Sequence, residues 1–279
     1  MVTSTNRDLV KKLQAHYKNT ATTPNTGVNY KVTSTLSAFA SYARSFNPVG
    51  QTAASTSQVP NQTGFGYDFG LKQSLFGDRL NFTASGYYNV REHVTVQELD
   101  PVTGFNINIA EGTQLFRGVE FDGTWNFAPN SSLIASYGHV NAKITNAGAN
   151  AFMQVGRSPA NVTPDQIGVA VKYSFTGAIK GLSANVGVRY RSATPPFNPG
   201  MGDTYSGNQF VSSTNQWAYR NPSWAVWDVG LNYDFPKISR YHLGESIRLN
   251  VGNLFDKAYL VSSTYGEHRT FYATYTVTH

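Results

Sequence analysis

Leu182-Ser-Ala-Asn-Val-Gly-Val-Arg-Tyr-Arg191 alternates apolar and polar residues along its whole length. Successive side chains of a β-strand point to opposite faces, so the leucine, the valines and the tyrosine share one face and both arginines share the other. An arginine that faced lipid at the middle of a bilayer would cost about 2–4 kcal/mol. The stretch therefore predicts a membrane-crossing strand whose arginines face an aqueous lumen.

The same alternation recurs along the chain. Between Ser223 and Phe235, an apolar set that contains Trp227 and Tyr233 alternates with a polar set that contains Asp228. We therefore expect an all-β chain, an antiparallel transmembrane β-barrel of the outer-membrane type with about eleven strands. The predicted strands are Pro24–Val32, Thr35–Arg44, Gly64–Phe76, Arg79–Gln97, Thr113–Phe127, Ser132–Ile144, Asp165–Phe175, Leu182–Ser192, Ser223–Phe235, Glu245–Phe255 and Arg269–Thr278.

The connections between these strands are alternately short and long. Thr33–Ser34 and Gly77–Asp78 are short, whereas Ser45–Thr63 and Ala193–Pro222 are long. Outer-membrane barrels have short periplasmic turns and long extracellular loops, so the alternation orients the sheet. Self-contained bacterial barrels have an even number of strands, and the odd count indicates part of a larger barrel. Residues 1–23 read as an extracellular loop or helical segment before the barrel portion at 24–279.

The composition agrees with a barrel and excludes several kinds of chemistry. Charged residues make up 14% of the chain, against roughly 25% in soluble proteins. Aromatic residues are equally frequent, which suits the girdles at the two membrane interfaces. The absence of cysteine excludes disulfides and thiolate metal sites. The net charge of +6 comes from scattered residues, so we expect no nucleic-acid partner. Residues 1–23 also lack the pattern of a signal peptide, as expected of a mature form or a fragment.

Five motifs stand in a recognisable order. Leu249–Tyr259 is an alternating strand that ends in Asn-Leu-Phe-Asp-Lys-x-Tyr. The other four are a hairpin over Gly27–Val32 and Leu36–Pro48, the stretch Phe69-Gly-Leu-Lys72, the stretch Phe116-Arg-Gly-Val-Glu-Phe121, and Tyr265-Gly-Glu-His-Arg-Thr-Phe271. Together they resemble the C-terminal half of the barrel of TonB-dependent outer-membrane receptors, in the branch that takes up ferric siderophores.

The resemblance implies a function and partners. Such receptors have a barrel of about 22 strands around an N-terminal plug domain, preceded by a TonB box. Neither the plug nor the box is found in this sequence, so the chain is expected to be the second half of the barrel. The resemblance implies TonB-dependent uptake of a ferric siderophore in the bacterial outer membrane, among outer-membrane lipid and lipopolysaccharide. Iron would enter only within the siderophore, no cofactor is expected, and the TonB complex would act through the plug.

Three groups of residues are candidates for a site. Aromatic residues and an arginine in the Ala193–Pro222 loop offer contacts to an anionic chelate: Tyr205, Phe210, Trp217, Tyr219 and Arg220. Charged residues on polar strand faces are expected to face the lumen or contact the plug: Lys72, Glu120, Asp122, Arg189, Arg191 and Arg248. The strand-end motif is expected to be architectural, through turn-forming side chains and interface aromatics: Asn253, Leu254, Phe255, Asp256 and Tyr259.

Other interpretations stay open. The same architecture serves other cargo, such as cobalamin or an oligosaccharide. A small stand-alone barrel, acting as a porin or a surface enzyme, and a soluble β-rich binding module are further alternatives. For an enzyme, only Asp203, Glu267 and His268 offer an acid–base set in outward loops, and we expect no catalysis from so loose a group. No two of the histidines have the spacing of a zinc motif, so no metal site is expected.

Overall fold

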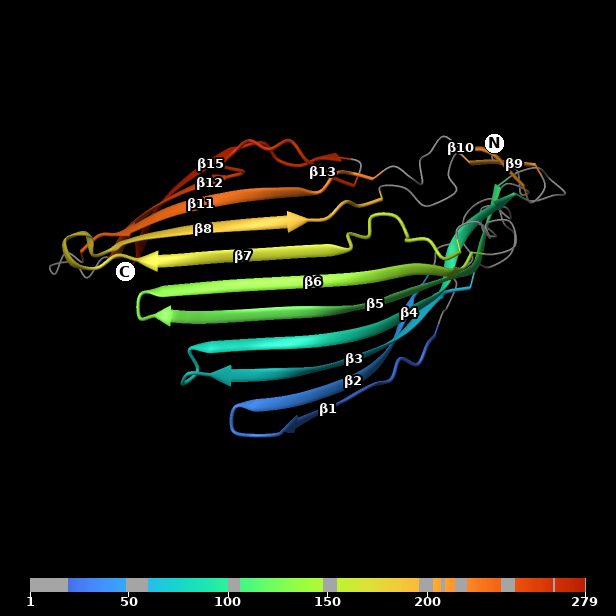
Figure 1. The fold of residues 1–279 in the computed structure, drawn as a ribbon, viewed down its shortest axis with the longest axis horizontal. Coiled ribbons are helices and arrows are strands. Elements are labelled where there is room, and N and C mark those ends of the chain that lie inside the picture. The colour runs from blue at the N-terminus through green and yellow to red at the C-terminus, as the bar shows by residue number, and fades with distance from the viewer. Residues whose placement is uncertain are drawn as a thin grey trace, which may run out of the picture.

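The computed structural model describes residues 20–48, 60–99, 106–147, 155–195, 203–206, 209–213, 220–236, 244–262 and 264–278. Eleven strands form one antiparallel sheet in which strand order follows the chain (Figure 1). All eleven predicted strands are found, with shifts of up to three residues at most of their ends. The exception is the strand predicted over Thr113–Phe127, which begins at Asn106. The strands are β1 (Asn25–Lys31), β2 (Leu36–Asn47), β3 (Gln62–Leu75), β4 (Leu80–Leu99), β5 (Asn106–Ala128), β6 (Ser131–Asn146), β7 (Asp165–Ser174), β8 (Leu182–Arg191), β11 (Trp224–Asp234), β12 (Gly244–Gly252) and β15 (Thr270–Thr278).

Two predicted connections contain short hairpins of their own. β9 (Asp203–Ser206) pairs with β10 (Gln209–Ser213) between β8 and β11. β13 (Leu260–Val261) pairs with β14 (Thr264–Tyr265) between β12 and β15. The short connection after β7 holds a single 3-10 turn, η2 (Gly177–Ile179). Neither hairpin interrupts the main sheet, because β8 still pairs with β11 and β12 with β15.

The apolar stripes of neighbouring strands coincide in register. Val186 of β8 lies opposite both Val171 of β7 and Val229 of β11. The resulting apolar face has no second layer of described protein over it, so Phe69 is 58% exposed and Phe271 is 72% exposed. A soluble sandwich would cover such a face with another sheet. In an outer-membrane barrel, lipid covers the face instead.

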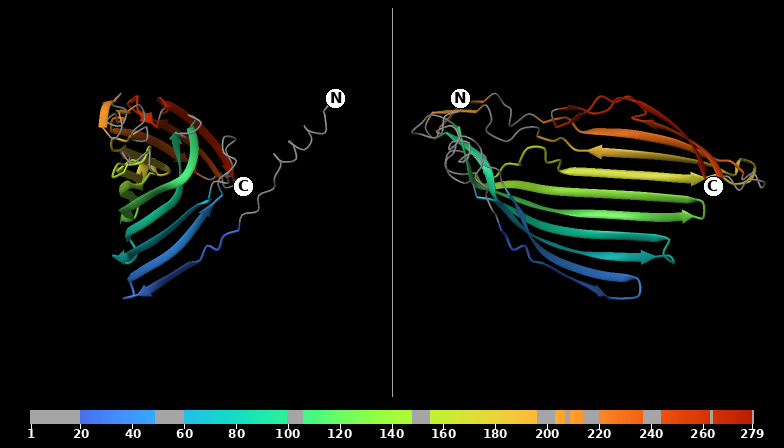
Figure 2. Two further views of the ribbon diagram at one scale, coloured as in Figure 1. Left: turned by 90° about the vertical axis from the view of Figure 1, so that its right-hand side faces the viewer. Right: turned by 180° about the vertical axis from the view of Figure 1, so that it is seen from behind.

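The sheet curves strongly but stays open. Figure 2 shows an arc with β1 at one side and β15 at the other. These two strands are the edges of the sheet and do not pair with each other. The described strands therefore have the order and curvature expected of a barrel wall without closing into a barrel. No helix among the described residues is long and apolar enough to cross a bilayer.

The two ends of the sheet differ. The hairpins β1–β2, β3–β4 and β5–β6 turn tightly at one end, as predicted, and the strand ends that lead into the longer connections lie at the other (Figure 1). We call these the short-turn end and the long-loop end. The hollows of the sheet are lined mainly by its polar face, which makes that face the concave side. Each hollow can therefore be placed along the wall by the strand positions that line it.

Candidate functional site

The polar face gathers all six charged residues that the sequence assigned to the lumen. Arg248 lies opposite Asn232, and Arg191 lies opposite Trp224, both in polar-face positions. Glu120 lies opposite Ser85, two positions from Asp122 on the same strand. Directly paired positions on this face run from β3 to β11 through Lys72, Thr83, Asp122, Ser136, Gly168, Arg189 and Val226.

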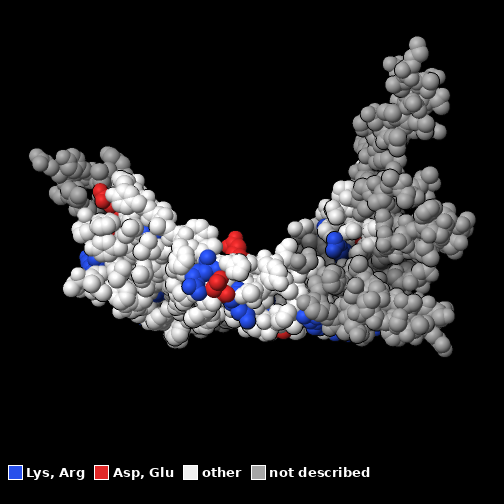
Figure 3. Space-filling model, turned by 90° about the horizontal axis from the view of Figure 1, so that it is seen from above, with Lys and Arg blue, Asp and Glu red and all other residues white. Residues whose placement is uncertain are grey.

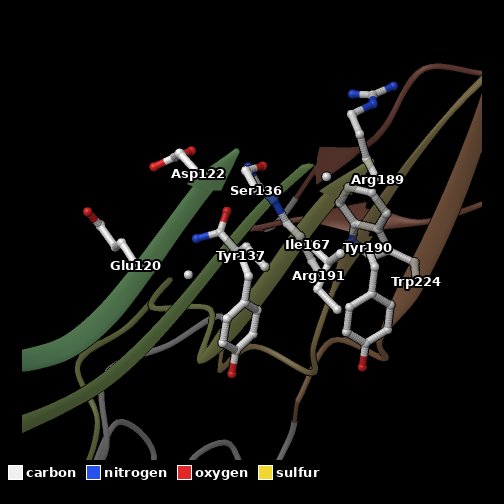
Figure 4. Close-up of a pocket in the computed structure, with 12 residues that line it drawn as sticks. Glu120, Asp122, Ser136, Tyr137, Ile167, Arg189, Tyr190, Arg191 and Trp224 are labelled. Atoms are coloured by element: carbon white, nitrogen blue, oxygen red, sulfur yellow. The ribbon is translucent and has the colours of Figure 1, made fainter. Parts of the chain in front are cut away.

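A central hollow of about 360 Å³ separates acidic from basic side chains on this face. Glu120 and Asp122 come from β5, while Arg189 and Arg191 come from β8. Figure 4 shows Glu120, Asp122 and Arg189 on one side of the sheet, with Tyr137 and Tyr190 on the other. Neither acid forms an ion pair with another described residue. The wall of the hollow therefore offers unneutralised negative charge to whatever lies in the lumen.

Charge is sparse elsewhere on the sheet. Seen from above, most of the described surface is uncharged, and charged side chains gather in a few places (Figure 3). One arginine of the hollow is engaged near the long-loop end: the Arg191 guanidinium lies 5.7 Å from the Trp224 ring centroid. Lys72 lies similarly over Phe39, with Nζ 5.2 Å from the ring centroid. Such cation–π contacts keep a charge in place while leaving it accessible.

Arg189 is linked to the strand-end motif through one carboxylate. The Asp228 Oδ2 atom accepts a hydrogen bond from Arg189 at 3.2 Å, and Oδ1 accepts one from the Asn253 backbone N–H at 2.9 Å. The Asn253 amide donates to the carbonyls of Lys257 and Glu267, and its Oδ1 accepts the Lys257 N–H. Asn253 is 4% exposed and has φ +50°. Its hydrogen bonds tie the end of β12 to the adjacent turn at Lys257 and to the backbone of Glu267, fourteen residues on.

Asp256 makes the second set of turn contacts. Its Oδ1 accepts the Arg269 backbone N–H at 2.9 Å and lies 3.2 Å from His268 Nδ1. The hydrogen bond from Arg269, helped by His268, lowers the pKa of the Asp256 carboxyl. Tyr259 packs against Trp224 with ring centroids 4.4 Å apart, and the Trp224 indole N–H donates to the Leu260 carbonyl. The side chains of the motif thus hold the β12–β15 connection against the wall.

The other two members of the motif point elsewhere. The Leu254 backbone N–H donates to the Trp227 carbonyl, and Phe255 is 68% exposed. Of the loose acid–base set, His268 contacts Asp256, and the Asp203 side chain lies outside the description. No cluster of three potential metal ligands occurs within the described part of the chain.

A hollow of about 610 Å³ at the long-loop end of the polar face was not predicted. Tyr87 and Arg91 of β4 contribute to it, with Asp68 of β3 and Gln166 of β7. The Nε and Nη2 atoms of Arg91 both donate hydrogen bonds to Gln62 Oε1, at 3.2 and 3.0 Å. The sequence did carry a signal for this hollow, because Tyr87 and Arg91 occupy polar-face positions of the predicted strand Arg79–Gln97.

The candidate ligand residues of the Ala193–Pro222 loop are only partly described. Tyr205 and Phe210 hold paired backbone positions in the β9–β10 hairpin. Trp217 and Tyr219 lie outside the described residues. Arg220 is exposed, next to Asn221, whose backbone forms a bridge with Thr194. The bridge closes the base of the loop and fixes where Arg220 leaves the sheet.

The curved sheet, its exposed apolar face and its charged polar face agree with the family that the sequence matches. Residues 2–254 match the family described as TonB dependent receptor-like, beta-barrel. This chain belongs to that family, whose members are proteins of the bacterial outer membrane.

Individual relatives are distant and longer. The chain is 25% identical, over 243 residues, to the ferrichrome outer membrane transporter and phage receptor of Escherichia coli K12, covering 86% of this chain and 29% of that protein. It is 28% identical over 246 residues to a TonB-dependent receptor of Haemophilus influenzae, covering 88% and 65%. The chain thus spans less than two thirds of the length of these relatives.

Solved structures share the fold. The ferric preacinetobactin receptor BauA of Acinetobacter baumannii superposes with a TM-score of 0.70 at 20% identity, covering 90% of this chain and 35% of that one. The ferric-catecholate import receptor Fiu of Escherichia coli K12 gives 0.67 at 22% identity, covering 90% and 34%. The eleven-stranded sheet therefore has the same fold as about a third of each of these longer chains.

Proposed function

We propose that this chain is the C-terminal portion of the barrel, over residues 24–279, in a receptor that imports ferric siderophores with TonB. The observation that carries the proposal is the charged concave face of a sheet that belongs to the TonB-dependent receptor family. The names of several relatives and structural neighbours refer to ferric siderophores, which supports the same cargo class. Iron is then cargo held by its chelator, and the chain supplies no catalytic step and no cofactor site.

The cargo is first bound at the long-loop end. A negatively charged ferric siderophore can pair with the guanidinium of Arg91. Two hydrogen bonds to Gln62 already hold that guanidinium in place. Tyr87 adds a flat surface and a hydroxyl beside it. In this proposal the loop residues Tyr205, Phe210, Trp217, Tyr219 and Arg220 contact the cargo from above.

Deeper in the lumen, the charged wall contacts a plug domain. Unpaired acids on the inner wall need partners or water, and a plug provides partners. We assign Glu120 and Asp122 to basic groups of the plug, and Lys72, Arg189, Arg191 and Arg248 to its acidic or polar groups. TonB would act on the plug rather than on this chain.

Binding of a ferric siderophore by the full receptor tests the proposal. We expect Arg91→Ala to weaken binding about tenfold, the loss of roughly one charge-assisted contact. Lys172→Ala is the matched control, because Lys172 lies on the same face at the short-turn end. Both variants should reach the outer membrane in equal amounts.

The class of cargo that the receptor binds decides between the siderophore assignment and its alternatives. A panel with hydroxamate, catecholate and mixed ferric chelates, together with cobalamin and an oligosaccharide, separates the cargo classes. Binding of cobalamin or sugar and of no iron chelate would replace the siderophore assignment while keeping the receptor architecture. Passive diffusion of all solutes, without TonB, would replace the receptor by a pore.

A further inference from the structure

Three hollows of the polar face adjoin one another. The hollow around Arg91 and the central hollow share Gln166 as a lining residue. The central hollow and a third hollow, of about 470 Å³, share Asp122. We call the third one the inner hollow, because its lining runs from Lys72 to the β1–β2 turn at Thr35, at the short-turn end. The three hollows together cross the polar face from the long-loop end to the short-turn end.

Lys72 lies far below Arg91 along the wall. Lys72 pairs with Thr83 of β4, and Arg91 lies eight positions further along that strand. At about 3.3 Å per residue and a strand tilt of about 40°, the two basic residues are about 20 Å apart along the barrel axis. The inner hollow is therefore a separate place from the cargo site around Arg91.

Each hollow contains a basic side chain that a neighbour on the wall holds in place. In the central hollow the Arg191 guanidinium lies over the Trp224 ring, and in the inner hollow the Lys72 ammonium lies over the Phe39 ring. Neither cation forms an ion pair with another described residue. Like Arg91, both are held by an uncharged partner, so their charges stay available to an anion.

Hydroxyl groups surround Lys72 in the inner hollow. Ser37 of β2 and Thr83 of β4 hold the positions directly paired with Lys72, and Thr124 of β5 lines the same hollow. Each hydroxyl can donate one hydrogen bond, and the ammonium group can donate three. The acid of this hollow, Asp122, is assigned above to a basic group of the plug. The volume lies within the range of ligand pockets, about 300–1,000 Å³, so the inner hollow can hold an anion among donors.

We propose that the inner hollow is a second cargo site, which a negatively charged ferric chelate occupies after it leaves the hollow around Arg91. This inference rests on the proposed import function. Before TonB acts on the plug, Lys72 faces acidic or polar groups of the plug. Anionic oxygens of the chelate then replace these groups on Lys72. The route between the two sites passes the central hollow, where Gly138 leaves the wall without a side chain.

Surface binding and uptake by the full receptor, measured in the same cells, test the inner site. The probe is the iron-55 complex of the negatively charged panel chelate that wild type binds most tightly. Without energy, Lys72→Ala should bind this probe as wild type does. With energy, it should import the probe about tenfold more slowly, the loss of roughly one charge-assisted contact. Lys72→Arg should keep the wild-type rate. Lys172→Ala is the matched control, on the same face at the short-turn end but outside the three hollows.

Gly138→Trp tests the route without changing a charge. A Cβ at Gly138 meets nothing within 4 Å, so the wall leaves room for a larger side chain. The variant should bind the probe normally and fail to import it. Gly187→Trp is its control, because Cβ contacts there begin at 3.6 Å and Gly187 lines none of the three hollows.

The opposite results separate the inner site from the proposed function. Normal uptake by Lys72→Ala or by Gly138→Trp would overturn the inner site and its route while leaving the import function in place. An equal loss for an uncharged chelate would assign Lys72 to the plug alone, and binding of uncharged chelates only by wild type would also overturn the site. If wild type bound no ferric chelate, the proposed function would fall, and the inner site with it.

Heat-modifiable migration in gels verifies that each variant is folded, because a folded barrel resists detergent until it is heated.

Discussion

Asp228 accepts the backbone N–H of Asn253 at 2.9 Å, which joins the middle of β11 to the end of β12. The same carboxylate pairs with Arg189, so the inner wall and the strand-end motif share one anchor. One side chain therefore contacts both the inner wall and the strand-end motif.

Asp228→Ala should lower the free energy of unfolding by about 2 kcal/mol. A hydrogen bond to a charged group contributes about 1.5–3 kcal/mol, and the bond from the Asn253 N–H accounts for most of the loss. The pair with Arg189 adds little, because the Arg189 side chain is 59% exposed. Urea unfolding in lipid vesicles measures the change. Asp234→Ala is the control, since among the described side chains its carboxylate accepts a hydrogen bond only from the Asn232 amide. Equal losses in the two variants would show that Asp228 has no special anchoring role.

Asn253→Ala should be more severe, costing about 2–4 kcal/mol. It removes the contacts of a buried amide and places alanine in the left-handed region of backbone conformation. Protease digestion should then cut the β12–β15 connection first. Asn232→Ala, at a half-buried side chain that does not contact this connection, should leave the digestion pattern of the wild type unchanged. An intact connection in Asn253→Ala would contradict the anchoring role.

Two glycines on adjacent strands give a matched pair. A Cβ at Gly118 would overlap the His139 carbonyl oxygen and lie 2.6 Å from the Tyr87 hydroxyl, whereas a Cβ at Gly138 meets nothing within 4 Å. Overpacking typically costs about 1–3 kcal/mol. Gly118→Ala should therefore unfold at lower urea concentration than Gly138→Ala. The reverse order would mean that the Tyr87 ring does not pack over Gly118.

The Asp256 contacts should give the β12–β15 connection a dependence on acid. Because the folded carboxyl has a lowered pKa, its stabilisation is present above the ordinary value of 3.8 and is lost as the pH falls through the folded value. Hydrogen exchange of the Arg269 amide should accelerate in that range. Asp256→Asn should exchange faster even at neutral pH and lose the acid dependence. Glu267→Gln, in the same connection, should follow the wild type.

The strand pattern was predictable because two solvents impose it. Lipid on one side and water on the other force side chains to alternate, so the eleven strands could be placed from local sequence alone. The start of β5 was missed. Its first residues, from Asn106, extend past the expected membrane band, where neither solvent requires an aromatic stripe.

The inner packing was not predictable in the same way. Trp224 and Val226 are apolar, yet they occupy polar-face positions and are 8% and 1% exposed. Tyr259 lies against Trp224, from a connection more than thirty residues away in the chain. Local alternation carries no information about such contacts. For the same reason the hollow around Arg91, built from six strands and a loop, was visible only in the structure.

The order of the main sheet also bears on how the chain enters a membrane. Strand order in the main sheet follows the chain, so each new strand can be added at the edge of the sheet formed by the strands before it. At each stage, unsatisfied backbone groups are confined to the two outermost strands. Assembly in chain order would thus keep the backbone hydrogen bonds of the inner strands satisfied while the chain enters the bilayer.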